Sequence, residues 1–255
     1  MSTKRAAIIL AAGKGKRMQS DLAKVLHQVH GIPIIQILVD RLSIFGFEKI
    51  VVVIGHQGED VKMALANYNV EFVWQREQLG TGHAVMMAEP ALRTFQGTTL
   101  VALGDVPFLS HKILQKLFIA HEKSQSAATC LSAEFDDPTG YGRIVRKEKT
   151  DILMKIVEHK DAALAEMGIR EINSGTFCFS NQILFKFLKK IGTDNAQGEY
   201  YLTDVIKLMY DNNLRVSVVK ADNPDEVCGI NSIEQLRELE AKFPNIVLTK
   251  NIDTK

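Results

Sequence analysis

Short, almost continuously apolar runs alternate with amphipathic segments through the first half of the chain. The apolar runs lie at residues 6–10, 49–54, 70–74 and 99–103. Continuous apolarity is typical of parallel strands that are buried on both faces. Between these runs, residues 33–45, 58–68 and 81–88 carry apolar side chains at helical spacing. Strands that alternate with helices predict βαβ units around a parallel sheet.

The pattern changes after residue 125, where strand-like runs follow one another without helices between them. These runs lie at residues 127–135, 143–146, 152–157 and 172–179. Such a succession favours antiparallel pairing beside the parallel sheet. Helices are then predicted at residues 182–191 and 202–210, and a strand at residues 214–219. We therefore predict an α/β fold: a Rossmann-like, mostly parallel sheet with helices on both faces and an antiparallel extension.

The C-terminal segment has the pattern of a single capped helix. Asn231-Ser-Ile-Glu234 resembles a capping box, and residues 233–243 carry one apolar stripe. Pro244 is expected to end this helix, and residues 245–255 are expected to form a loosely docked tail. The predicted organisation is a main domain at residues 1–230, followed by a C-terminal helix and tail at residues 231–255.

Composition excludes several classes of protein. The chain has 255 residues, 46% of them hydrophobic and 24% charged, as in ordinary globular proteins. Its formal net charge of +1 gives no general attraction to nucleic acid or to a membrane surface. No apolar run approaches the roughly 20 residues that span a bilayer. We therefore expect neither a nucleic-acid partner nor a membrane partner.

Cysteine usage points to a reducing compartment. Cys130, Cys178 and Cys228 are odd in number and widely spaced, which favours neither a disulfide framework nor a zinc site. Lys4-Arg5 and the apolar run after it superficially resemble a signal peptide, but that run is short and a strongly basic loop follows it. We predict a cytoplasmic protein.

A glycine-rich basic loop, LAAGKGKRM at residues 10–18, follows the first predicted strand. Gly13 and Gly15 allow a tight turn that exposes backbone N–H groups to a ligand. The cations around this loop are Lys14, Lys16, Arg17 and Lys24. The spelling matches neither the dinucleotide fingerprint nor the P-loop. An ordinary tight turn is the alternative, but the clustered cations favour phosphate binding.

Other polar residues are predicted where strands end. Asp105 follows an apolar run, and a carboxylate at the carboxyl end of a buried strand is a suitable Mg²⁺ ligand; the alternative is an N-cap for the next helix. Gly80 and Thr81 form a second glycine turn, which is either part of the same crevice or a simple helix start. Glu158 and Asn173 have the chemistry to bind sugar hydroxyls, although each, taken alone, is more often an ordinary surface residue.

Nine short motifs occur here in the order and spacing of one known family. They are LAAGKGKRM at 10–18, DLAKVLH at 21–27, QLGTGHA at 78–84, LGDVP at 103–107, DPTGYGR at 137–143, IVEHKDA at 156–162, INSG at 172–175, NAQGEYYLTD at 195–204 and GIN at 229–231. Over residues 5–243 the chain resembles the uridylyltransferase domain of bacterial bifunctional N-acetylglucosamine-1-phosphate uridylyltransferase/glucosamine-1-phosphate acetyltransferases. The resemblance implies that residues 1–230 form a nucleotidyltransferase domain whose antiparallel extension binds the sugar.

The resemblance also implies roles for individual residues of this sequence. Those implied to contact the nucleotide are Leu10, Ala12, Gly13, Gly15, Lys24, Gln75, Gly80 and Thr81. Those implied to contact N-acetylglucosamine are Thr81, Gly142, Glu158, Asn173 and Tyr201. Arg17 and Lys24 are implied to hold the triphosphate as catalytic residues. Asp105 and Asn231 are implied to bind Mg²⁺, although a helix N-cap is the simpler interpretation of Asn231.

The implied reaction converts UTP and N-acetylglucosamine 1-phosphate into UDP-N-acetylglucosamine and pyrophosphate. Two alternatives remain: a related nucleotidyltransferase with another sugar or nucleotide, and a nucleotide-sugar binding protein with weak turnover. This sequence departs from the usual family pattern at Lys16, Ala23, Leu103 and Ser174. It also contains no hexapeptide repeats of the left-handed β-helix, so acetyltransferase activity is not expected. We expect the chain to be a monomer or a weak oligomer.

Overall fold

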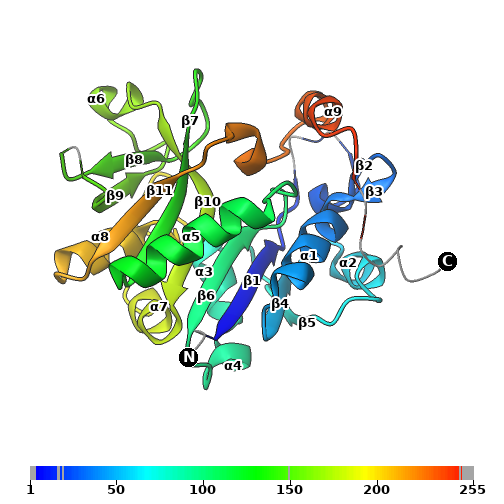
Figure 1. Ribbon diagram of the computed structural model, residues 1–255, viewed down its shortest axis with the longest axis horizontal. Helices are drawn as coiled ribbons and strands as arrows, with labels where there is room; N and C mark the ends of the chain where they lie inside the picture. Colours follow the sequence, from blue (N-terminus) through cyan, green and yellow to red (C-terminus); the bar gives the residue numbers. More distant parts are fainter. Residues whose placement is uncertain (1–3, 16–17, 19, 149, 247, 249–255) are drawn as a thin grey trace.

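The structure is a computed structural model that describes residues 4–15, 18, 20–148, 150–246 and 248. These residues form a nine-stranded mixed sheet, in which seven strands follow the order β11-β7-β10-β6-β1-β4-β5 (Figure 1). The seven are β1 (Arg5–Ala11), β4 (Lys49–Ile54), β5 (Glu71–Trp74), β6 (Thr98–Leu103), β7 (Ala128–Glu134), β10 (Glu171–Ser180) and β11 (Val216–Lys220). The remaining two, β8 (Arg143–Arg146) and β9 (Leu153–Val157), form an extension from β10.

The half of the sheet built from β6, β1, β4 and β5 is parallel throughout. Residues 6–9 of β1 are completely buried, which agrees with the continuous apolar run. Because parallel strands share one direction, their carboxyl ends lie along the same edge of the sheet. The glycine loop after β1 and the acidic residue after β6 therefore emerge side by side.

β10 is the long antiparallel strand that joins the two halves of the sheet. Its C-terminal part pairs with β6, from Phe177 opposite Val101 to Ser180 opposite Thr98. Near its N-terminal end, Ile172 pairs instead with Arg143 of β8. Its register against β7 shifts between Asn173 and Thr176, which marks a bulge. On this edge of β10 the sheet therefore divides into β6 and the β8–β9 extension.

Helices cover both faces of the sheet, as predicted. Those that pack on one face are α1 (Ile34–Phe45), α2 (Gly58–Ala64) and α5 (His111–Ser124). Those on the other face are α3 (Thr81–Met87), α7 (Asn181–Leu188) and α8 (Asp204–Asp211). The short helices α4 (Glu89–Leu92) and α6 (Leu164–Met167) have no counterpart in the pattern analysis. Figure 1 shows α1 and α5 in front of the sheet and α3 behind it.

The C-terminal helix α9 (Ile233–Lys242) returns to the beginning of the chain. It packs against the hairpin of β2 (Gln28–Val29) and β3 (Ile32–Pro33), in a hydrophobic cluster that includes Met18 and Phe108. Phe243 stacks on Phe108 with ring centroids 4.0 Å apart. The expected stop before Pro244 is confirmed. The predicted cap is off by one residue, because the side chain of Ser232 caps the helix rather than that of Asn231.

Candidate active site

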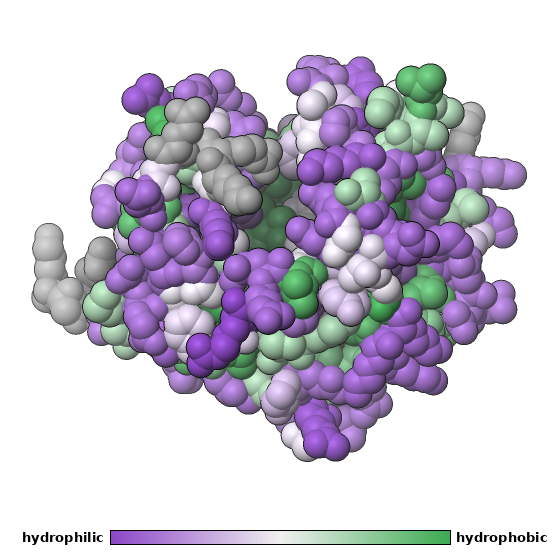
Figure 2. Space-filling model, turned by 180° about the vertical axis from the view of Figure 1, so that it is seen from behind, coloured by the Kyte–Doolittle hydropathy of each residue, from purple (hydrophilic) through white to green (hydrophobic). Residues whose placement is uncertain are grey.

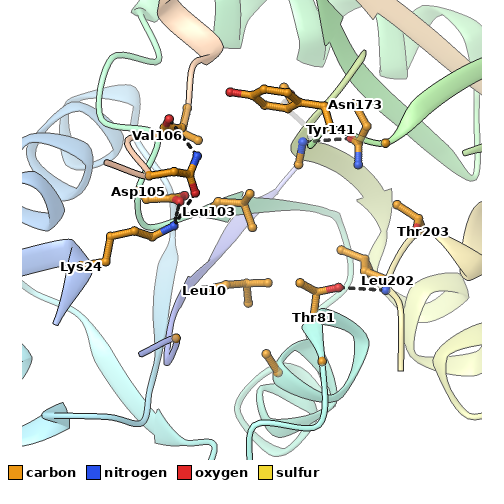
Figure 3. Close-up of a pocket in the computed structure, with 18 of the residues that line it drawn as sticks. Leu10, Lys24, Thr81, Leu103, Asp105, Val106, Tyr141, Asn173, Leu202 and Thr203 are labelled. Atoms are coloured by element: carbon orange, nitrogen blue, oxygen red, sulfur yellow. Dashed lines mark hydrogen bonds and ion pairs between the residues drawn. The ribbon is translucent and has the colours of Figure 1, made fainter. Parts of the chain in front are cut away.

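A cavity of about 490 Å³ opens where β1 and β6 end and where β10 bulges. Figure 2 shows the molecule hollowed at this place, with hydrophobic side chains at the bottom and hydrophilic walls. Figure 3 shows Leu10 and Leu103 in the middle of the cavity lining. Lys24 and Asp105 lie to one side of them, and Asn173 and Thr203 lie to the other. The cavity therefore has two polar walls separated by an apolar floor.

The glycine loop that leaves β1 is shaped for close approach at Gly15. This residue has a φ of +64°, and a Cβ atom there would lie 2.6 Å from Cβ of Lys24. Only glycine meets both demands without strain. Gly13 differs, because a Cβ atom there would meet no atom within 4 Å. Gly13 lines the cavity and leaves its space open to a ligand.

Three residues far apart in the sequence meet on the first wall. Lys24 begins the short 3-10 helix η2 (Lys24–Leu26). Its ammonium nitrogen Nζ forms an ion pair with Oδ2 of Asp105 and donates a hydrogen bond of 3.1 Å to Oδ1 of Asn231. A carboxylate oxygen and an amide oxygen thus converge on one cation (Figure 3 shows the contact of Lys24 with Asp105).

Backbone contacts bring Asn231 to Asp105. The N–H of Ile230 donates to the carbonyl of Asp105 at 2.9 Å, which fixes the neighbouring residue beside the acid. Asn231 donates from Nδ2 to the carbonyl of Gly229 at 3.0 Å, so its Oδ1 is turned toward Lys24. Its backbone N–H donates to Oε1 of Gln235 at 2.8 Å. The amide is therefore held in one orientation by its own segment.

The capping alternatives for the two predicted metal ligands are wrong. Ser110, and not Asp105, caps α5, because its hydroxyl accepts from the N–H of Ile113 at 3.2 Å. Ser232, and not Asn231, caps α9 in the same way. Neither the side chain of Asp105 nor that of Asn231 therefore caps a helix.

Two of the residues implied to contact the nucleotide, Gln75 and Gly80, lie between β5 and α3. Gln75 is buried, and its Nε2 donates to the carbonyl of Gly80 at 3.0 Å and lies 3.1 Å from Nδ1 of His83. A ligand that donates a hydrogen bond would therefore meet the amide oxygen of Gln75. Thr81 accepts from the N–H of Leu202 at 3.1 Å, which ties α3 to the segment before α8 (Figure 3).

The second wall is built from hydrogen bonds rather than ion pairs. The hydroxyl of Thr203 donates to Oε1 of Glu158 at 2.9 Å. Burial raises the pKa of Glu158, and the nearby Asp204 and Asp161 raise it further against the lowering effect of that hydrogen bond. A Cβ atom on Gly142 would lie only 3.4 Å from Oε2 of this carboxylate.

Asn173 stands at the start of the β10 bulge, where the backbone fixes its position. Its N–H donates to the carbonyl of Gly142 at 2.9 Å. Its Oδ1 accepts from the N–H of Gly175 at 2.9 Å and from Sγ of Cys130 at 3.4 Å. Because the amide oxygen has these two donors, the amide nitrogen is the atom suited to meet a ligand oxygen.

Comparisons with known proteins place the chain in a family. A family model described as a MobA-like NTP transferase domain matches residues 7–167. The chain belongs to this family. The solved structure of a UDP-glucose pyrophosphorylase complexed with UDP-glucose is similar in fold, with a TM-score of 0.76, 18% identity and coverage of 94% of this chain and 98% of that chain. HddC from Yersinia pseudotuberculosis reaches a TM-score of 0.68 at 20% identity, over 93% and 99% of the two chains. The predicted fold class is confirmed.

Curated relatives confirm the resemblance to the bifunctional family. The bifunctional protein GlmU of Halalkalibacterium halodurans is 48% identical over 236 residues, or 92% of this chain and 51% of that protein. Those of Brevibacillus brevis and Bacillus cytotoxicus are 48% and 47% identical over 95% and 97% of this chain, and 52% and 54% of their own lengths. The chain spans about half the length of the curated relatives that it matches.

The NTP transferase fold brings most of the predicted site residues to one cavity. Those that line it are Leu10, Ala12, Gly13, Lys24, Gln75, Gly80, Thr81, Asp105, Gly142, Glu158, Asn173 and Asn231. Gly15 supports Lys24 from outside the lining, and Arg17 lies outside the described residues. Tyr201 is buried and does not belong to the lining; its hydroxyl accepts from Nε2 of Gln197 at 2.9 Å.

Several lining residues of this NTP transferase domain were missed as candidates. They include Gln78, Thr139, Tyr141, Leu202, Thr203 and Gln235. The signal for Thr203 was within reach, because it belongs to the same motif as Tyr201 and bears a hydroxyl. Its contact with Glu158, however, joins residues 45 positions apart and cannot be inferred from spacing.

The structure also describes the cysteines, possible clusters of metal ligands and possible membrane-spanning helices. Cys130, Cys178 and Cys228 are all free thiols. Among the described residues, no group of three or more His, Cys, Asp or Glu side chains could hold a metal ion. No helix in the described part of the chain is long and apolar enough to cross a membrane.

Proposed function

We propose that this domain transfers a uridylyl group from UTP to N-acetylglucosamine 1-phosphate, forming UDP-N-acetylglucosamine and pyrophosphate. The observation that carries the proposal is the pair of unlike walls on one cavity, one built around Lys24 and Asp105 and the other around Glu158 and Asn173. A charged wall suits a triphosphate, and a wall of directed hydrogen bonds suits sugar hydroxyls. The similarity to proteins named GlmU supports this choice of substrates.

The chemistry requires positioning more than activation. A sugar phosphate is already an anionic oxygen nucleophile near neutral pH. One of its oxygens forms a bond to the α-phosphorus of UTP, and the bond from that phosphorus to the bridging oxygen of pyrophosphate breaks. No protein nucleophile or general base is required, so the protein's contribution is orientation and charge neutralisation.

Lys24 is the described cation that we assign to the triphosphate, and we assign Arg17 to the same task. Lys24 lines the same cavity as Gly13, whose open surface lets phosphate oxygens approach the backbone. A cation at this position offsets the repulsion between the two anionic substrates. It also stabilises the charge that develops on departing pyrophosphate.

The residues present also fit a divalent metal. Oδ2 of Asp105 and Oδ1 of Asn231 already converge on a single positive charge, and both are hard oxygen donors of the kind that Mg²⁺ prefers. We propose that these two side chains hold Mg²⁺ together with substrate phosphate oxygens. When bound, the ion supplies further neutralisation of phosphate charge.

We assign the remaining lining residues by wall. Leu10, Ala12, Gly13, Gln75 and Gly80 line the nucleoside part, with the amide oxygen of Gln75 as acceptor for the N–H of the uracil ring. The sugar part is formed by Thr81, Gly142, Glu158 and Asn173, and we add Thr203 because it holds the carboxylate of Glu158. Tyr201 is buried outside the lining, and we assign it no direct contact with the sugar.

The sequence predicts that the main domain ends at residue 230. We propose that residues 231–242 also belong to the catalytic unit. The contact between Asn231 and Lys24 and the packing of α9 on the β2–β3 hairpin support this grouping. We retain the cytoplasmic location, which the three free thiols support. We also retain a monomer or weak oligomer as our proposal for the assembly.

A pyrophosphate-release assay tests the proposed function. Purified protein is mixed with Mg²⁺, one nucleoside triphosphate and one sugar 1-phosphate, in a panel of four nucleotides and several sugars. We expect UTP with N-acetylglucosamine 1-phosphate to give the highest kcat/KM. If glucose 1-phosphate is preferred, the assignment of the sugar substrate is wrong and the assignment of the reaction class holds. If UDP-N-acetylglucosamine binds by calorimetry and no pair gives pyrophosphate, the protein is a binder and the proposed function is wrong.

A further inference from the structure

Lys24 occupies the place on the first wall where the two proposed metal ligands converge. Its ammonium contacts Asp105 and Asn231 together, although these residues lie 81 and 207 positions away in the sequence. The side chains of Lys24 and Asp105 are only 19% and 10% exposed, so water screens the pair weakly. The ion pair is therefore a largely buried part of the cavity wall and not a solvent-exposed surface contact.

The ammonium and a divalent cation cannot share this position. A metal ion bound by both oxygens would lie about 2.1 Å from each of them. The Nζ atom of Lys24 is itself within hydrogen-bond distance of both oxygens, at 3.1 Å from Oδ1 of Asn231. The two cations would then be nearly in contact, with strong repulsion at a site of low exposure. Either Lys24 holds the oxygens or the metal does.

The side chain of Lys24 has more freedom to leave than that of Asn231. Its backbone is fixed by η2 and by the close approach of Gly15. Asn231 is held by the carbonyl of Gly229 and by Gln235. The four-carbon stem of a lysine, in contrast, swings readily to another anion. The same cavity includes Gly13, beside which we propose that the phosphates of the nucleotide bind.

We infer that Lys24 is a resident counterion that keeps the metal position filled by an ammonium group until a nucleotide draws it away. This inference rests on the proposed function, from which it takes the roles of Lys24, Asp105 and Asn231. The free protein should bind a divalent metal weakly. Triphosphate binding transfers the ammonium to the phosphates and exposes the two oxygens. Nucleotide and metal therefore bind cooperatively, and each strengthens the other by the same factor.

The test is binding of Mn²⁺ alone to the free protein, measured by the loss of the electron paramagnetic resonance signal of aqueous Mn²⁺. Mn²⁺ takes the same oxygen ligands as Mg²⁺. We expect weak binding by the wild type and tighter binding by Lys24→Met, by about 5- to 150-fold. Lys24→Arg keeps the positive charge and should bind as weakly as the wild type. In Lys24→Met/Asp105→Asn the gain should disappear.

Lys220→Met is the matched control. Lys220 pairs with Glu134 at 2.7 Å, so its removal also frees a carboxylate, but at an exposed place outside the cavity lining. This variant should not gain Mn²⁺ affinity. Far-UV circular dichroism and thermal melting establish that each variant is folded. If Lys24→Met does not fold, Lys24→Gln takes its place.

Equal Mn²⁺ affinity of the free wild type and the folded neutral variant overturns the inference. A gain in Lys220→Met as large as that in Lys24→Met does so as well. These outcomes are separate from the fate of the proposed function. If product forms and the Mn²⁺ affinities are equal, the proposed function holds and the counterion role of Lys24 is wrong. If the Mn²⁺ affinities follow the prediction and no pyrophosphate is released, the counterion role holds and the proposed function is wrong.

Discussion

The two walls of the cavity are held together by different interactions. The wall of Lys24, Asp105 and Asn231 is organised by charge: an ion pair joins η2 to the segment after β6, and a hydrogen bond joins η2 to the segment before α9. The wall of Glu158 and Asn173 is organised by the backbone, through the bulge of β10 and the pairing of β8 and β9. Its central carboxylate has a raised pKa and a hydroxyl partner instead of a cation.

This difference indicates how errors in each wall should show in kinetics. Charge contacts gain most when charge develops in the transition state, so the first wall should control turnover. Directed hydrogen bonds to a neutral sugar act in the ground state and in the transition state alike, so the second wall should control substrate binding.

The largest effect is expected on the charged wall. Asp105→Ala or Lys24→Ala should lower kcat by at least about 100-fold, which is the scale of one lost transition-state charge contact. Pyrophosphate release at saturating substrates is the measurement. Asp222→Ala, which removes an exposed acid paired with Lys116, is the control and should leave kcat unchanged. Near wild-type turnover in either wall variant would contradict the assigned roles.

A smaller effect with a different kinetic signature is expected on the sugar wall. Asn173→Ala should raise the KM for the sugar phosphate by about tenfold, the scale of one lost hydrogen bond, and leave the KM for UTP close to its original value. Steady-state kinetics with each substrate varied in turn separate the two. Asn212→Ala, at the C-terminus of α8, is the control. An equal rise in both KM values would remove the distinction between the walls.

The bulge of β10 should matter for stability. Gly175 has a φ of +76°, and a Cβ atom there would lie 2.4 Å from Cδ1 of Leu103. Gly175→Ala should therefore lower the free energy of unfolding by about 1–2 kcal/mol, the cost of a left-handed residue with a side chain. Urea denaturation measures it. Gly192→Ala, where the added atom meets nothing within 4 Å, should change stability much less. Equal losses in both variants would argue against strain at the bulge.

The smallest effect is a pH dependence of stability at Glu158. Burial raises the pKa of this carboxyl in the folded protein above its ordinary value of 4.5, so the folded state holds the proton more tightly than the unfolded chain. Stability from this group is thus fully present below that ordinary value and is lost as pH rises through the raised pKa. Glu158→Gln cannot ionise, and it should exceed the wild type in stability at pH 8 but not at pH 4.

Urea denaturation at several pH values follows the difference between wild type and Glu158→Gln. The glutamine can still accept the hydrogen bond of Thr203, so the comparison isolates the charge. A difference that stays constant across the range would show that Glu158 ionises in the folded protein as easily as in the unfolded chain.

Local patterns were sufficient for the elements of this fold. The buried runs that became β1, β4 and β6 are almost continuously apolar, and a strand buried on both faces can be recognised from its own residues. The strand-rich region after residue 125 likewise predicted antiparallel pairing, which β10 confirms. The helix cap at Ser232 was misplaced by one residue, because several polar residues in a row can each serve as a cap.

The chemical groups available to this protein are visible in its residues: a glycine loop with cations after the first strand, an acid after a later strand, and the motifs that carry the family resemblance. Which of these groups meet depends on the folded chain. The division of the sheet at β10, the contact of Thr203 with Glu158 and the seat of Lys24 between Asp105 and Asn231 all join distant segments. Such contacts depend on strand order and register, which arise from packing of the whole chain and not from any local pattern.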